Sequence, residues 1–245
     1  MYRSRNFYIK VRGDLALFTN PATKGGGEKF SYAVPTRQAL QGIVDAIYFK
    51  PTITNMVTEV KVCKQIQTEL HGVRALLANY GADLSYVSYL SDVEYLVKFH
   101  FVWNENRPDL RHDRLPNKHE AIMARSIRKG GRRDIFLGTR ECVGLIDDVS
   151  QEEYESALVA YGNQTIDFGI MFHSFKYPTD KSEPLKSYFT HTVMENGVIR
   201  FKEQDECEIV NTLLSYAFKA QGQIKSVDDE LEDYQADEEA EKGEH

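Results

Sequence analysis

The stretch DVEYLVKFHFVW, residues 92–103, gives the clearest strand pattern in the chain. Successive side chains of a strand point to opposite faces, so every second residue shares a face. One face of this strand is predicted to be apolar and buried: Val93, Tyr95, Val97, Phe99, Phe101 and Trp103. Lys98 and His100 fall on the other face, where we expect His100 to be a half-exposed strand residue rather than a catalyst.

The residues before this strand predict a strand, a helix and a second strand. Residues 7–18 and 56–64 alternate as strands, and residues 36–49 carry apolar residues at helical spacing after Thr36, a good N-cap. Tyr48 falls on the last helical turn at the flank of the apolar stripe. The local pattern favours a tyrosine at the edge of the core whose hydroxyl reaches water. Residues 67–90 fit either a short helix or a long hairpin.

The residues after it add a helix that begins near Asn117 and a strand over residues 134–146. The resulting order of strand, helix, strand, strand, helix, strand is that of a ferredoxin-like βαββαβ fold. We therefore predict an α+β protein in which residues 1–149 form such a domain. RNA-binding domains often use this architecture, but the aromatic RNP signature is absent, so the order alone predicts no function.

Residues 150–225 are predicted to form a second, β-rich antiparallel domain. It should open with a helix whose N-terminus carries a capping box of Ser150 and Glu153. A β segment over 165–178 and a hairpin turning at Glu195-Asn196-Gly197 follow, and residues 208–220 are predicted to form a last helix.

The net charge of −7 hides two opposite regions. Residues 226–245 hold ten Asp or Glu and one Lys, which gives −9 and leaves +2 for the other 225 residues. Residues 98–140 hold eleven Lys or Arg and five Asp or Glu, or +6. The acidic tail is predicted to be disordered, either as a solubilising segment or as a polyanion that competes with nucleic acid for the basic region.

Composition also bounds the cellular setting. No apolar run approaches the roughly 18–20 residues of a membrane span, and the N-terminus lacks the apolar region of a signal peptide. Cys63, Cys142 and Cys207 are far apart and form neither a disulfide framework nor a CxxC metal site. The cytoplasm is the simplest location to expect.

The segment LPNKHEAIMARSIRKGGRR, residues 115–133, combines a helix start with basic residues. Asn117 is predicted to be the N-cap, with Glu120 completing a capping box, so that Lys118 and His119 lie in the first turn. Unpaired backbone N–H groups and the helix dipole make that end a natural phosphate site. A lysine is unfavourable for the helix there, which indicates that Lys118 serves a ligand.

A helical wheel separates the basic side chains of this helix from its apolar ones. Lys118, Arg125, Arg128 and Lys129 fall on one side, opposite Met123, Ala124 and Ile127. A solvated helix face explains such a pattern about equally well. The residues predicted to contact nucleic acid are Arg125, Arg128, Lys129, Arg132 and Arg133, with Lys24 and Lys29 of the glycine-rich loop as weaker candidates.

The helix start predicts separate roles for its two functional side chains. Positive potential favours a neutral His119 that can accept a proton, while Lys118 can hold a phosphate. A neutral histidine, a cation and a phenol suffice to cleave RNA without a metal, through attack of the ribose 2′-OH on the adjacent phosphate. DNA lacks that hydroxyl and would bind without being cut. A metal-dependent DNase is the weaker alternative, since no carboxylate cluster or HExxH motif is evident.

Four blocks together resemble the type I-C CRISPR-associated endoribonucleases, the d variant of the fifth Cas family. They are VRGDLALFTNP, SYAVPTRQALQGIVDAIYFKP, PNKHEAIMARSIRKGGRRDIFLGTRECVG and IDFGIMFHSFKYP, spread over roughly residues 7–178. The resemblance implies a ferredoxin-like N-terminal domain, a β-rich C-terminal domain and a metal-independent Tyr-Lys-His mechanism. Matched residue by residue, these three are Tyr48, Lys118 and His119, so the resemblance promotes Tyr48 to a catalytic role.

The resemblance also implies a substrate and partners. Members of the family bind the CRISPR repeat hairpin, cut precursor RNA at the 3′ base of the stem and keep the 5′ handle. They then belong to a surveillance complex beside its backbone and large subunits. Some variants of the wider family only cap the RNA, so a non-catalytic subunit is the alternative; retention of Tyr48 and the Lys118-His119 pair argues against it.

Overall fold

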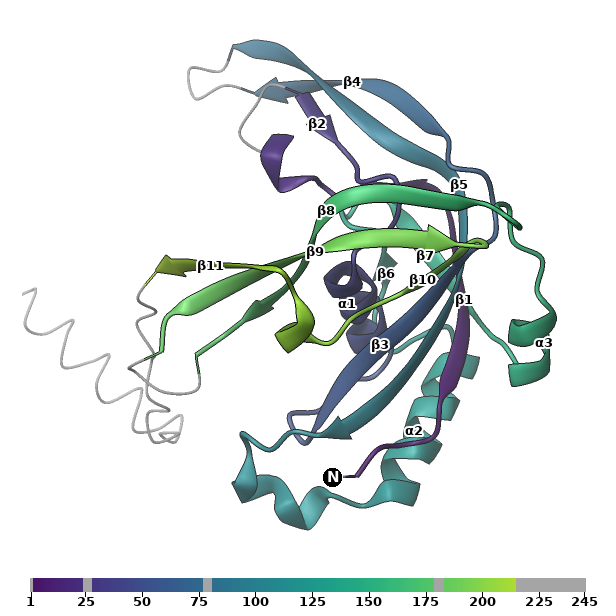
Figure 1. Ribbon diagram of the computed structural model, residues 1–245, viewed down its shortest axis with the longest axis vertical. Helices are drawn as coiled ribbons and strands as arrows, with labels where there is room; N and C mark the ends of the chain where they lie inside the picture. Colours follow the sequence, from purple (N-terminus) through teal and green to yellow (C-terminus); the bar gives the residue numbers. More distant parts are fainter. Residues whose placement is uncertain (1, 24–27, 77–80, 179–182, 215–245) are drawn as a thin grey trace, which may run out of the picture.

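The computed structural model describes residues 2–23, 28–76, 81–178 and 183–214, and Figure 1 shows the chain. The acidic tail and Lys24 lie outside these residues. The α-helices are α1 (Arg37–Ile47), α2 (Pro116–Arg128) and α3 (Gln151–Ser156), and the 3₁₀ helices are η1 (Pro21–Thr23), η2 (Pro108–Asp113) and η3 (Gln204–Glu206). The strands are β1 (Phe7–Ala16), β2 (Glu28–Phe30), β3 (Ile53–Val62), β4 (Thr68–Leu76), β5 (Ala82–Trp103), β6 (Ile135–Phe136), β7 (Val143–Asp148), β8 (Thr165–Lys176), β9 (Leu185–Glu195), β10 (Val198–Arg200) and β11 (Ile209–Leu214).

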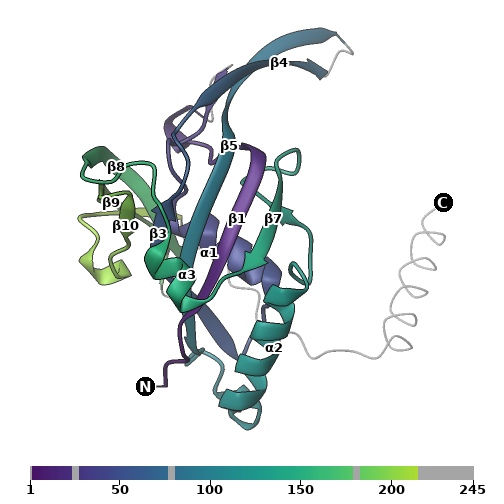
Figure 2. The same cartoon turned by 90° about the vertical axis from the view of Figure 1, so that its right-hand side faces the viewer.

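The strands join in one sheet, dominated by antiparallel pairs, whose path runs β11-β9-β10-β3-β5-β1-β7-β6. At its centre β3, β5, β1 and β7 lie side by side, and each neighbouring pair is antiparallel. Figure 2 shows α3 in front of these strands and α1 behind them. The protein therefore combines helices with a mainly antiparallel sheet, as the predicted α+β class requires.

The apolar face predicted for residues 92–103 is confirmed. Val97, Phe99 and Phe101 are fully buried, and they form one core with α1 and α2. The opposite face of the same strands holds a small second cluster, in which Tyr8 and Leu96 pack against Tyr154 of α3. Burial of the first face is what directs α1 and α2 to one side of the sheet.

Residues 67–90 adopt the hairpin alternative rather than the helix. β4 pairs with the first half of β5 over nine register positions, from Thr68 with Leu90 to Leu76 with Ala82. Figure 1 shows this hairpin extending as an arm at the top of the molecule, with α2 at the opposite end.

His100 is buried, with 7% of its surface exposed, and not half-exposed as predicted. Met56 of β3 pairs with His100 of β5 in the sheet. The Met56 sulfur lies 3.7 Å from Nη2 of Arg37. Burial, and then the charges of Arg3 and Arg37, lower the pKa of His100 to about 4. The strand pattern missed this because the groups near His100, namely Met56, Arg3 and Arg37, come from other parts of the chain.

Two other segments have a different secondary structure from the one predicted. Residues 134–146 form not one strand but the short hairpin of β6 and β7, because Gly138 turns the chain with φ +101°. Residues 209–214 form strand β11, paired with β9, where a helix was predicted. Pairing with an open sheet edge overrides local helix propensity.

The local turn and cap signals are confirmed. The side chain of Thr36 accepts a hydrogen bond from the Ala39 N–H at the start of α1. Both hydrogen bonds of the Ser150–Glu153 capping box are present at α3. The β9–β10 hairpin turns at Asn196 and Gly197, whose φ angles are +52° and +75°, as a two-residue turn requires.

Candidate functional site

The side chains of Tyr48 and His119 meet in the core, although 71 positions separate them in the chain. Tyr48 is the C-cap of α1, and its hydroxyl lies 2.9 Å from Nδ1 of His119 in α2. Both side chains are 0% exposed, so the expectation that the Tyr48 hydroxyl reaches water is wrong. The side-chain amide of Asn55 donates to the carbonyl of Tyr48 at 3.0 Å, which ties the end of α1 to β3.

The start of α2 differs from the prediction and still presents Lys118 and His119 in adjacent positions. The helix begins at Pro116 after Leu115, and no side chain caps it, so Asn117 is not the N-cap. Proline suits the first helical position because its φ is fixed and its missing N–H would have been unpaired. Glu120 does not complete a capping box; its carboxylate accepts a hydrogen bond from the Tyr2 hydroxyl at 2.8 Å.

Asp113, the last residue of η2, connects the two functional residues of α2. Its backbone carbonyl is 2.8 Å from Nε2 of His119, and its carboxylate forms an ion pair with the ammonium of Lys118. Its Oδ2 also accepts a hydrogen bond from the Thr52 hydroxyl at 2.6 Å. The bonds to Lys118 and then Thr52 lower the pKa of Asp113 to about 2, so the carboxylate is ionised at neutral pH. No sequence pattern separates Asp113 from the other polar residues of its loop.

These contacts define the proton positions of the site. A carbonyl can only accept, so Nε2 of His119 carries a proton and donates it to Asp113. Burial, opposed by the charge of Arg132, raises the pKa of Tyr48, so the phenol is protonated at neutral pH and has a proton to donate to Nδ1 of His119. The rings of Phe101 and Trp103 close the remaining sides, with centroids 6.3 Å and 5.7 Å from the imidazole.

The predicted basic residues of α2 form an exposed surface beside this pair. All five of them are exposed: Arg125, Arg128, Lys129, Arg132 and Arg133. The buried stripe of Met123 and Ile127 lies on the other side of the helix, as the wheel predicts. The guanidinium of Arg132 lies over the Tyr48 ring, 5.3 Å from its centroid, so the basic surface reaches the buried pair.

A hollow of about 600 Å³ follows the end of α2. Lys129, Arg132 and Arg133 line it together with Gly130 and Gly131, which turn the chain with φ +78° and +102°. Asp134 also lines it, so three cations and one carboxylate leave a net positive charge, which together with the glycine backbone suits a phosphate-bearing ligand.

Lys29 is not part of this surface. It is exposed in β2, beside the arm, and Figure 1 shows β2 and α2 at opposite ends of the molecule. The structure therefore brings together Tyr48, Lys118, His119 and the five basic residues of the α2 surface, but not Lys29.

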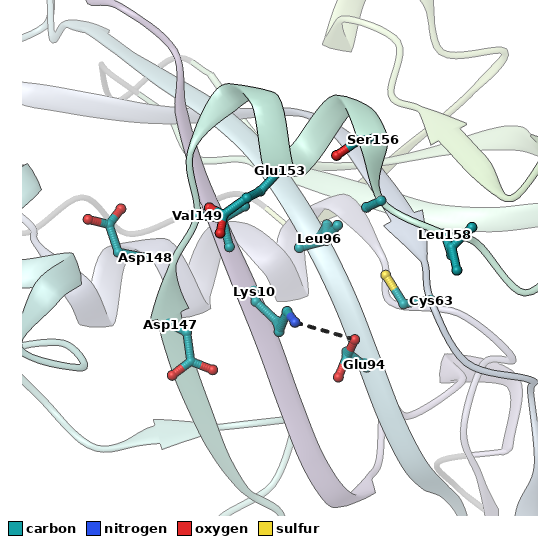
Figure 3. A pocket seen from close by; sticks show the side chains of 11 residues that line it. Lys10, Cys63, Glu94, Leu96, Asp147, Asp148, Val149, Glu153, Ser156 and Leu158 are labelled. Atoms are coloured by element: carbon teal, nitrogen blue, oxygen red, sulfur yellow. Dashed lines mark ion pairs between the residues drawn. The ribbon is translucent and has the colours of Figure 1, made fainter.

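A second hollow of about 550 Å³ lies on the face covered by α3 (Figure 3). Lys10 lines it and forms an ion pair with Glu94 at 3.8 Å. Its other charged lining residues are all acidic: Asp147, Asp148 and Glu153. This excess of negative charge disfavours a nucleic-acid backbone, and the basic surface of α2 is the better candidate.

Across residues 2–23, 28–76, 81–178 and 183–214, no group of three or more His, Cys, Asp or Glu side chains could hold a metal ion. In the same residues, no helix is both long enough and apolar enough to cross a membrane.

Two solved structures are similar to this chain in both sequence and fold. A solved structure of a CRISPR-associated protein is 69% identical, with a TM-score of 0.77, over 86% of this chain and 99% of that one. A functionally uncharacterized protein from Streptococcus mutans, SMU1763c, is 71% identical, with a TM-score of 0.76, over 86% of this chain and 100% of its own. Both have the fold described above.

The particular family follows from the sequence match. The model of the CRISPR-associated Cas5d proteins, of the Cas5 group, matches residues 8–202, and the chain belongs to this family. Two relatives are named CRISPR pre-crRNA endoribonuclease Cas5d. The one from Thermus thermophilus is 29% identical over 72% of this chain and 76% of its own length. The one from Mannheimia succiniciproducens is 27% identical over 78% and 92%. The resemblance to the d variant of the fifth Cas family is thus confirmed.

Proposed function

We propose that the protein is a metal-independent endoribonuclease that cuts precursor CRISPR RNA with Tyr48, Lys118 and His119. The observation that carries the proposal is the 2.9 Å contact between the Tyr48 hydroxyl and His119, next to an exposed lysine at a helix start. The names of the relatives from Thermus thermophilus and Mannheimia succiniciproducens support the choice of substrate.

In the reaction, the ribose 2′-OH replaces the Tyr48 hydroxyl at Nδ1 of His119 and gives its proton to that nitrogen. The 2′ oxygen attacks the adjacent phosphorus, the bond from phosphorus to the 5′ oxygen breaks, and a 2′,3′-cyclic phosphate forms. Tyr48 donates its proton to the leaving 5′ oxygen and recovers one from the imidazolium. Lys118 stabilises the charge that develops on the phosphate.

The RNA is proposed to run along the exposed basic side chains of α2 into the hollow after the helix. Arg132 touches both the hollow and the Tyr48 ring, so a strand held there passes next to the reacting groups. The protein recognises the repeat hairpin, cuts at the 3′ base of the stem and keeps the 5′ handle. Lys29, far from α2, would contact a different part of the RNA.

We further infer that the protein joins the type I-C surveillance complex beside its backbone and large subunits. The strand order β3-β5-β1-β7, with α1 and α2 on one face, supports a ferredoxin-like unit up to about residue 149. Strands β8 to β11 belong to the β-rich unit that follows. The sheet continues from one unit to the other through the antiparallel pair of β10 with β3.

One observation favours a second candidate, a subunit that binds the RNA handle without cutting it. Tyr48 and His119 are fully buried and both ring nitrogens of His119 have partners, as in a structural core histidine. For cleavage, this closed arrangement has to open when the RNA binds.

Incubation of the protein with its repeat RNA in EDTA decides between the two. The endoribonuclease gives a product with a 5′-hydroxyl end and a second product with a 2′,3′-cyclic phosphate. A 2′-deoxy substitution at the scissile nucleotide blocks the reaction. Tight binding with no product in either EDTA or Mg²⁺ would establish the non-catalytic role, and cleavage of the 2′-deoxy substrate would disprove the 2′-OH mechanism.

A further inference from the structure

The closed site poses a specific question, since no ribose can reach an imidazole that is 0% exposed. Four groups surround the His119 ring: Tyr48, Phe101, Trp103 and the carbonyl of Asp113. Tyr48 and Phe101 are themselves fully buried. Asp113 ends the 3₁₀ helix η2, in which no residue is buried. Of the four groups, it should therefore need the least free energy to move away from the ring.

Polar contacts hold η2 in place. Asp113 bonds to Lys118 and Thr52, and the following residue, Arg114, forms an ion pair with Glu105 at 3.1 Å. Lys118 is 44% exposed and Glu105 51%, so water and salt weaken both ion pairs. An anion that offers Lys118 a better interaction than Asp113 can therefore release the segment.

We propose that Asp113 is a latch residue that keeps the site closed until an RNA phosphate displaces its carboxylate from Lys118. In the free protein, the carboxylate neutralises the lysine while the carbonyl of the same residue covers His119. When a phosphate takes the lysine, Asp113 and η2 withdraw, and the ribose can approach the imidazole of His119 and take the place of the Tyr48 hydroxyl at Nδ1. This inference rests on the proposed function and assigns Asp113 a positioning role that the Tyr-Lys-His set does not include.

The latch opens when a phosphate competes with the Asp113 carboxylate for Lys118, and not when Asp113 takes up a proton. The pKa of Asp113 is well below neutrality, so the carboxylate stays ionised in any buffer that supports RNA binding. A phosphodiester carries the same charge and offers two acceptor oxygens, so it competes for Lys118 on equal terms. Contacts of the rest of the RNA with the basic surface of α2 then favour exchange.

The test measures binding of a repeat hairpin RNA that carries a 2′-deoxy scissile nucleotide. Asp113→Asn keeps the carbonyl and the side-chain shape but removes the charge, so Kd should fall by roughly two- to fivefold, the range of an exposed ion pair. In a Lys118→Ala background, Asp113→Asn should have no effect on Kd.

Two variants separate the latch from a general gain of positive charge. Asp109→Asn lies on the same helix and breaks a comparable ion pair, with Arg107 at 2.7 Å, and should leave Kd unchanged. Thr52→Val changes no charge but removes a bond that holds the latch, so it should also lower Kd. An unchanged Kd in Asp113→Asn, or an equal gain in Asp109→Asn or in the Lys118→Ala background, would overturn the proposal.

The single tryptophan of the chain, Trp103, reports the opening directly because its ring lies beside His119. Acrylamide should quench its fluorescence more strongly in Asp113→Asn than in wild type, and more strongly still when RNA is bound. Identical quenching in all three states would mean that η2 does not move. Wild-type cleavage in EDTA is measured alongside: if it fails, the proposed function is wrong, whereas cleavage with an unresponsive Asp113 refutes only the latch.

Discussion

The phenol of Tyr48 donates a hydrogen bond of 2.9 Å to Nδ1 of His119 inside a core that excludes water. The bond joins the end of α1 to the first turn of α2, and it fixes both the tautomer of the imidazole and the direction of its lone pair. A stable fold and the proposed proton acceptor therefore depend on the same contact. Variants of the two residues should alter stability and cleavage by different amounts.

Tyr48→Phe removes one oxygen and leaves Nδ1 of His119 buried without a donor. We expect the free energy of unfolding to fall by about 1–3 kcal/mol and the single-turnover cleavage rate by about 10²-fold or more, while hairpin affinity stays the same. Urea unfolding followed by Trp103 fluorescence and a denaturing gel measure the two quantities. Tyr32→Phe is the matched control, since its hydroxyl accepts a bond from the Phe172 N–H at 3.2 Å. It should cost stability without slowing cleavage, and equal loss of cleavage in both variants would make the role of Tyr48 structural.

His119→Ala should abolish cleavage while the repeat hairpin still binds, because the basic surface of α2 remains intact. The lost ring leaves a cavity, so the variant should also unfold about 2–4 kcal/mol more easily. His119→Gln fills more of that space and can still donate to the Asp113 carbonyl, which separates catalysis from folding. If His119→Gln folds like wild type and still cuts at a comparable rate, His119 is not the base; if both variants lose binding, it is a docking residue.

The local features of this structure, including Lys118 and His119 at the start of α2, were predictable from the sequence, and the assembly of the site in space was not. Thr36 and Ser150 cap their helices as expected because capping depends on residues within one turn. The burial of Tyr48 and His100 depends on elements far away in the chain, which a local pattern cannot register. Only the resemblance indicated that Tyr48 belongs with His119, and their contact then emerged from the packing of α1 against α2. Asp113 gave no signal because its contacts with Lys118, Thr52 and His119 form only in the folded chain.

If the basic surface of α2 binds RNA, the Kd for RNA should depend on salt concentration through its side chains. Each phosphate contact to single-stranded RNA contributes about 0.7 to the slope of log Kd against log salt, and each to a duplex about 0.9. Arg128→Ala and Lys129→Ala should each weaken RNA binding and lower the slope by roughly that amount, whatever the RNA sequence. Arg12→Ala is the matched control, because it removes the same charge from an ion pair with Asp147 at 3.1 Å. An equal change in slope for Arg12→Ala would mean that the α2 surface is an ordinary solvated helix face and not an RNA-binding surface.

Buried His100 should make the fold sensitive to mild acid. Its pKa is about 4 in the folded protein, against about 6.5 when unfolded, so at pH 7 it is neutral in both states and has no effect on pH dependence. As pH falls below 6.5, the unfolded chain binds a proton that the folded protein refuses, and stability is lost until pH reaches about 4. From pH 7 to pH 5, wild type should therefore lose up to about 2 kcal/mol more than His100→Gln in urea unfolding. The exposed His112→Gln should follow wild type, and parallel curves for wild type and His100→Gln would mean that the buried ring accepts its proton in place.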